Sequence, residues 1–140
     1  MKNNSHMKIK KLLLLFLFFF ATLVSQAQEQ KLDSLLRVWN DLSAPDTSRL
    51  KAIHKIARKI YINSNPDSAF YYAQLQYDFA LTKGLKMQMA DALTAQGGSY
   101  WIRSNYPKAL DYYQQDLKIR EEIADKKATI PKPLATTSEV

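Results

Sequence analysis

The side chains with catalytic potential in this sequence are few and isolated. After the first 27 residues there is one histidine, His54, and a helical zinc site would need a second histidine at position 58, which is Arg58. Ser48 and Lys51 have the spacing of a Ser-x-x-Lys nucleophile motif, but no other element of such an enzyme accompanies them. Ser48 also falls where a helix cap is expected. These residues therefore predict no catalytic centre.

Composition excludes further kinds of site. The 140-residue chain has no Cys, which excludes disulfides, thiolate zinc ligands and cysteine nucleophiles. It has 3 Gly and no Gly-x4-Gly-Lys loop that would cradle a phosphate. Glu121 and Glu122 are adjacent on an expected helix, so their carboxylates point apart instead of forming an acid–base pair. We therefore expect no enzyme activity, no metal and no cofactor, although a catalytic domain beyond residue 140 stays open.

The positive charge of the chain is concentrated at its start. The formal net charge is +7, but four of the lysines lie within the first 11 residues, where there is no acidic residue. The chain after residue 27 has 16 basic and 13 acidic residues, a net charge of +3. Nucleic-acid-binding domains carry a more clustered and lopsided charge, so we expect no nucleic-acid partner.

The first 27 residues have the pattern of a signal peptide. After the lysines comes an apolar run over residues 12–24, which as a helix would rise only about 20 Å, against roughly 30 Å for a bilayer core. Ser25 and Ala27 place small residues at the −3 and −1 positions of a cleavage site after Ala27. We expect an exported chain, periplasmic or secreted, with an uncleaved membrane anchor as the alternative.

The remainder has apolar residues at helical spacing and no strand-like alternation, which predicts an all-α fold. Residues 28–42 form one amphipathic helix with an apolar stripe, made of Leu32, Leu35, Leu36 and Trp39. The next helix follows Pro45, with Asp46 or Thr47 as its expected cap, and its apolar face comprises Leu50, Ile53, Ala57 and Ile60. Asn65 and Pro66 predict another helix start, with Asn65 as N-cap and Pro66 at the first helical position.

A shift of 40 residues aligns the chain with itself. Between positions 47 and 87, eight residues are identical to the residue 40 positions later, where about two or three would match by chance. Ser64 and Asn65, for example, match Ser104 and Asn105. A pair of helices that repeats at a fixed period of this size is typical of a solenoid.

The second unit resembles a tetratricopeptide repeat. Gly97 and Tyr100, three apart in the first helix, and Ala109 and Tyr113, four apart in the second, match that pattern. Gly97 and Ala109 would sit where the two helices cross, where a larger side chain would push the backbones apart. The resemblance implies an α-solenoid of antiparallel helix pairs, with two repeats at residues 46–86 and 87–127. Residues 28–45 would be an N-terminal capping helix, and residues 128–140 an irregular tail.

The resemblance also implies a function, because such arrays bind a peptide or protein on the concave face lined by the first helix of each unit. Carrying the groove positions onto this sequence gives these candidates: Lys51, His54, Arg58, Tyr61, Thr94, Gly98 and Trp101. The expected mechanism is stacking on Tyr61 and Trp101, with charge pairing from Lys51 and Arg58 to acidic groups. Packing of Tyr61 and Trp101 between the units is the alternative role.

The end of the chain leaves two interpretations open. About three units are normally needed for a stable array, yet Pro131 and Pro133 would interrupt a third one. Residues 128–140 are then either a natural tail, or the result of a truncation or frame slip near Lys127. The repeats resemble exported regions of bacterial sensors, so the alternative function is a truncated sensory region of a membrane signalling protein. The output domain of such a protein (cyclase, histidine kinase or transcriptional regulator) and a membrane segment would follow residue 140. We therefore expect membrane contact only through the leader or through that missing C-terminal part.

Overall fold

The chain is helical throughout the part that the structure describes. The computed structural model describes residues 3–129, without the side chains of residues 3–6, 22–25 and 127–129. The elements are α1 (Asn3–Asn40), α2 (Asp46–Lys55), the π-helix η1 (Ile56–Tyr61), α3 (Pro66–Thr82), α4 (Lys86–Ile102) and α5 (Tyr106–Thr129). No strand occurs within residues 3–129, so the expected all-α class is confirmed.

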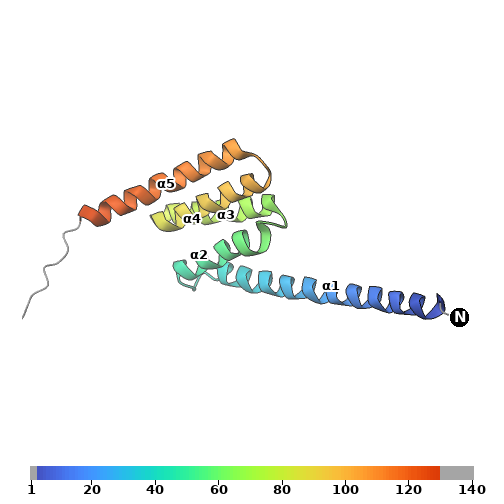
Figure 1. Ribbon diagram of the computed structural model, residues 1–140. Coiled ribbons are helices and arrows are strands. Elements are labelled where there is room, and N and C mark those ends of the chain that lie inside the picture. Colours follow the sequence, from blue (N-terminus) through green and yellow to red (C-terminus); the bar gives the residue numbers. More distant parts are fainter. Residues whose placement is uncertain (1–2, 130–140) are drawn as a thin grey trace, which may run out of the picture.

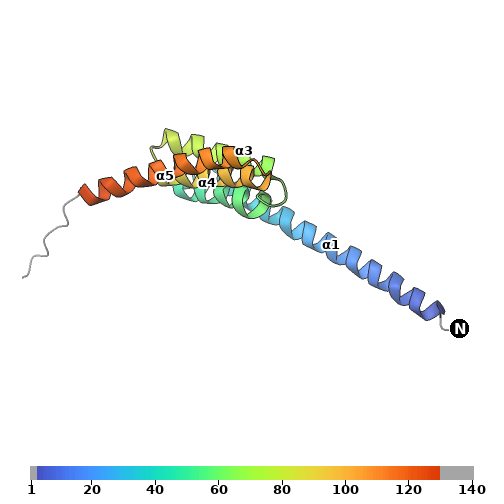
Figure 2. The same ribbon diagram turned by 45° about the horizontal axis from the view of Figure 1, so that its top comes forward.

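Neighbours in the sequence are also neighbours in space. The main contacts join α1 to α2, α2 and η1 to α3, α3 to α4, and α4 to α5. Figure 1 shows α1 and α5 on opposite edges of the molecule, and both Figures 1 and 2 show the first part of α1 extending away from the other helices. Each helix thus packs mainly against the helices that are next to it in the sequence.

Helix α1 is longer than the helix predicted at residues 28–42. It runs without a break from Asn3 to Asn40, through the expected cleavage site after Ala27. Its predicted stripe packs on buried Ile53, Ile56 and Ile60, through Leu32, Leu35, Leu36 and Trp39. The apolar side chains of residues 12–20 are exposed. Among the described residues, no helix combines the length and the apolar character needed to cross a bilayer.

Arg49 of α2 contacts both the last turn of α1 and helix α3. Its Nε donates a hydrogen bond to the carbonyl of Trp39 at 2.9 Å. Its guanidinium carbon lies 5.3 Å from the ring centroid of Trp39 and 4.6 Å from that of Phe79. The two rings meet edge to face at 5.4 Å. A cation held between two aromatic rings and a carbonyl fixes the angle at which α1 leaves the bundle.

The helix after Pro45 differs from the prediction in two ways. The predicted cap at Asp46 or Thr47 is wrong, because the helix already begins at Asp46 and its N-cap is Pro45, which has no capping side chain. Asp46 instead places a carboxylate in the first turn, where the helix dipole favours negative charge. The predicted face of Leu50, Ile53, Ala57 and Ile60 is buried, and so is Ile56. The wider turns of η1 alter the helical register, and Ile56 and Ile60 share one core cluster with Ile53.

The predicted start of α3 is confirmed. The side chain of Asn65 accepts a hydrogen bond from Ser68 N at 3.0 Å, and Pro66 is the first helical residue. Asn105 makes the corresponding bond with Lys108 N at 3.3 Å, ahead of α5. Helix α5 continues to Thr129, two residues into the expected tail, and residues 130–140 lie outside the described residues.

Small residues lie where the helices approach most closely. Ala57 of η1, Ala73 of α3 and Ala95 of α4 form one buried cluster, each at most 1% exposed. Gly97 of α4 lies under the ring of Tyr113, so that a Cβ on Gly97 would be 2.6 Å from Tyr113 Cε1. Ala109, the other predicted crossing residue, is 1% exposed. The space between α4 and α5 is therefore too narrow for a side chain at Gly97, and Ala109 places only a methyl group there.

We predict that Gly97→Leu lowers the free energy of unfolding by about 2–3 kcal/mol, because the new side chain must displace the ring of Tyr113. The matched control is Gly98→Ala, whose Cβ would meet Ile62 Cδ1 at 3.4 Å, an ordinary contact. That control should be neutral or stabilising by up to about 1 kcal/mol, since alanine favours the helix. Urea denaturation of both variants checks this, and equal stabilities would contradict the close contact.

Candidate functional site

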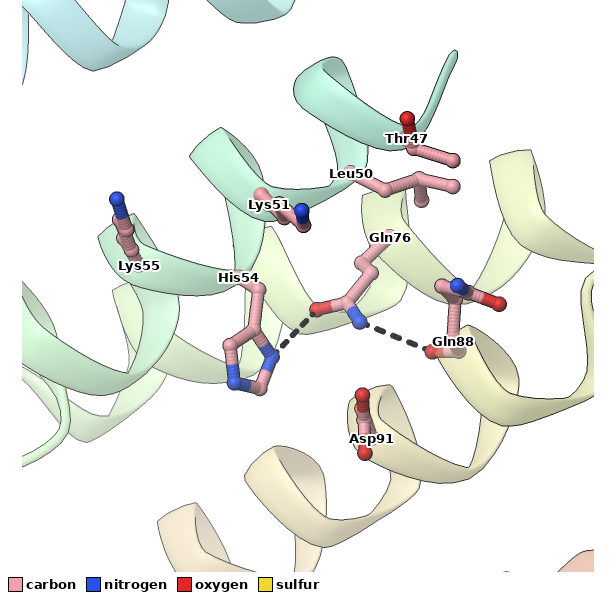
Figure 3. Close-up of a pocket in the computed structure, with 8 residues that line it drawn as sticks. All are labelled: Thr47, Leu50, Lys51, His54, Lys55, Gln76, Gln88 and Asp91. Carbon is pink, nitrogen blue, oxygen red and sulfur yellow. Dashed lines mark hydrogen bonds between the residues drawn. The ribbon is translucent and has the colours of Figure 1, made fainter.

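A pocket opens between α2, α3 and α4. Its volume is about 440 Å³. Figure 3 shows the side chains that line it, which are Thr47, Leu50, Lys51, His54, Lys55, Gln76, Gln88 and Asp91. Two of the predicted groove residues, Lys51 and His54, therefore share one pocket.

Gln76 forms the floor of this pocket and links its walls. Its side chain is almost fully buried, at 1% exposed. Its Oε1 accepts a hydrogen bond from His54 Nδ1 at 3.1 Å, and its Nε2 donates to the carbonyl of Gln88 at 2.9 Å (Figure 3). With Nδ1 used in this way, His54 keeps Nε2 for solvent or a ligand. The amide thus connects α2, α3 and α4 and fixes the imidazole at the pocket wall.

The α2 and η1 side of the pocket carries positive charge that no acidic side chain neutralises. Lys51, Lys55 and Arg58 are exposed, and none of them forms a salt bridge with a residue that the structure describes. Lys51 and Lys55 are four positions apart in α2, so they lie on one side of that helix, and Arg58 follows in η1. This row of cations is available to an acidic ligand.

The carboxylate on the α4 side of the pocket, Asp91, is already paired with a cation. Arg120 of α5 donates to Asp91 at 2.9 Å and to Asp116 at 2.7 Å. The hydrogen bond to Asp91 is the main reason why the pKa of Arg120 is raised above its usual value, so the guanidinium stays charged. Because α5 already engages Asp91, the carboxylate does not neutralise Lys51 across the pocket.

The predicted residues of the second unit lie farther along α4. The hydroxyl of Thr94 donates to Asp116 at 2.9 Å and to the carbonyl of Ala90 at 3.2 Å. Gly98 faces Ile62. Trp101 is 56% exposed, with its ring 4.9 Å from that of Tyr106. None of Thr94, Gly98 and Trp101 is among the residues that line the pocket.

Arg58 and Tyr61 also lie outside the lining. The ring of Tyr61 stacks on Tyr72 with centroids 5.4 Å apart and an interplanar angle of 4°. Burial raises the pKa of Tyr72, and the neighbouring Tyr61 adds to this effect. One face of Tyr61 is therefore committed to packing within its own helix pair, whereas the indole of Trp101 is exposed.

Sequence reasoning missed the floor of the pocket. Gln76 follows the buried residue Ala73 by three positions and precedes the buried Ala80 by four, so it is a polar residue on an apolar stripe. That position was the available signal for a buried hydrogen bond. Asp91 stands 40 positions after Lys51, so the internal alignment places it at the position of Lys51 in the second unit.

Comparisons with protein-family models, with curated proteins and with solved structures found no match for this chain. The site is therefore interpreted from its own geometry. Within the described residues there is also no group of three or more side chains that could hold a metal ion.

We predict that Gln76→Leu lowers the free energy of unfolding by about 1–2 kcal/mol, because two hydrogen bonds between helices are lost. Leu is close to Gln in size, so the change leaves no large cavity. The control is Gln115→Leu, at an exposed position of α5, which should alter stability by less than about 0.5 kcal/mol. Thermal and urea unfolding measure both, and an unaffected Gln76→Leu variant would show that the buried amide does not join the helices.

Proposed function

We propose that this protein is an exported protein-interaction module, built of tetratricopeptide-like helix pairs, which binds an acidic peptide segment of another protein. The observation that carries the proposal is the pair of exposed cations Lys51 and Lys55 in the pocket lining, followed in the chain by Arg58, with no salt bridge from any of the three to a described residue. The proposed activity is binding, without catalysis or a cofactor.

The spacing of the cations suits an extended peptide. Lys51 and Lys55 are four residues apart in α2, which corresponds to about 6 Å along the helix. An extended peptide covers that distance in about two residues. Two acidic side chains on such a segment would pair with the row, while His54 Nε2 and the side chain of Gln88 would bond to the peptide backbone. Trp101, farther along the groove, offers an exposed ring for stacking.

The helix pairs support the tetratricopeptide-like part of the proposal. The two second helices begin in the same way, with Asn65 and Asn105 each bonding to the amide three residues on. Small residues lie between the helices at the crossing positions of the tetratricopeptide pattern, Gly97 and Ala109. The 40-residue shift also pairs Lys51 with Asp91 in the two first helices that flank the pocket.

Export is supported by the leader and by where α1 meets the core. All of its side chains in the core cluster come after Ala27, namely Leu32, Leu35, Leu36 and Trp39. Removal of residues 1–27 would therefore leave that cluster whole. Mass spectrometry of the chain expressed in an exporting bacterium should find a product that begins at Gln28. A retained product that still begins at Met1 would contradict cleavage.

We predict that Lys51→Glu/Lys55→Glu weakens binding of an acidic peptide at least tenfold. The probe is a fluorescein-labelled hexapeptide of alternating Glu and Ala, followed by fluorescence anisotropy, with the Lys–Ala hexapeptide as negative probe. Added salt should weaken wild-type binding, because it screens exposed charges. The control Lys31→Glu/Lys126→Glu changes net charge equally at exposed positions on α1 and α5. Equal weakening by the two double variants would exclude the pocket row as the site.

A further inference from the structure

Helix α5 has an apolar ridge on the side that turns away from α3. The ridge consists of Tyr106, Leu110 and Leu117, at helical spacing. Tyr106 is 53% exposed, Leu110 56% and Leu117 55%, and the exposed ring of Trp101 contacts Tyr106. Large apolar side chains gathered in this way on a surface mark an interaction site.

The corresponding face of the first helix pair shows how such a ridge is normally covered. Forty positions before Leu110 stands Phe70 of α3. The ring of Phe70 packs against the rings of Tyr100 at 5.5 Å and Tyr112 at 5.8 Å. The same face of α3 is thus packed inside the molecule, whereas among the described residues the α5 ridge stays uncovered.

The charges beside the ridge would complement the same charges on a second copy of α5. Asp111 and Lys118 are both exposed, and each directly follows a ridge leucine, Leu110 or Leu117. Suppose that two copies of α5 pack antiparallel about a two-fold axis beside Gln114. Leu110 of one copy then meets Leu117 of the other, and Asp111 meets Lys118. In a parallel pair, by contrast, Asp111 would face its own copy and repel it.

We propose that the α5 ridge is a dimerisation surface whose occupant is α5 of a second copy, packed antiparallel. Helix α5 has 24 residues, about 36 Å in length, which gives a long contact for two helices. Figure 1 shows α5 at the edge opposite α1, which leaves room beside α5 for a second copy. The ridge is also separate from the pocket, so a dimer keeps both pockets open.

Site-directed cross-linking tests the arrangement, because the chain has no native Cys to react. Gln114→Cys would lie beside the two-fold axis, whereas Gln115→Cys is exposed on another side of the same helix. With a short bis-maleimide reagent at micromolar full-length protein, Gln114→Cys should give a covalent dimer and Gln115→Cys at least fivefold less. Both variants keep the leader, so association through the leader would not favour one position. Equal yields, or no dimer from Gln114→Cys, would overturn the proposal.

A charge swap tests the orientation. In the Gln114→Cys background, Asp111→Lys should reduce the dimer yield at least fivefold, because two lysines then face each other across the interface. The double change Asp111→Lys/Lys118→Asp should restore the yield, since the opposite charges meet again. Both residues are exposed, so circular dichroism should show an intact helical fold. An unchanged yield in the single variant, or no recovery in the double variant, would contradict antiparallel packing.

Discussion

The close approach of three helices at Ala57, Ala73 and Ala95 is the constraint on which the rest of the molecule depends. With only methyl groups between the backbones, η1, α3 and α4 come close enough for Gln76 to reach from one helix to the next. A similarly close approach occurs between α4 and α5, where Gly97 lies under the ring of Tyr113. The alanine contact itself buries little apolar surface per residue, so the buried isoleucines Ile53 and Ile56 and the contacts at the edges of the bundle must add to the stability.

Two arginines strengthen those edges. Arg49 lies between Trp39 and Phe79 where α1 joins the bundle. Arg103 lies 4.3 Å from the ring centroid of Tyr100 and pairs with Asp67 at 2.6 Å, which connects α3 to the end of α4. Arg49, Arg103 and Arg120 thus have structural partners inside the fold. Lys51, Lys55 and Arg58 form no salt bridge with a described residue, and this contrast separates structural charge from charge that is available for binding.

The sequence predicts the elements well where a local rule decides them, and less well where tertiary contact does. Asn65 and Pro66 mark the start of α3, because capping and a fixed φ act within one turn. The π-helical turns of η1 were not predictable from spacing, since they depend on how Ile56 and Ile60 fit beside α1. In the site, Lys51 and His54 were identified through a resemblance, but Gln76 was not, because its importance comes from carbonyl and imidazole groups on two other helices.

Amide hydrogen exchange under native conditions tests the central claim, that the alanine contact is the most stable part of the fold. We expect the slowest exchange in η1, α3 and α4 around Ala57, Ala73 and Ala95, at rates set by global unfolding. We expect fast exchange before Ala27 in α1, where the apolar side chains of residues 12–20 lie exposed. If the amides around Ala73 and Ala95 exchange as fast as those in that first part of α1, the alanine contact is not the most stable part of the fold.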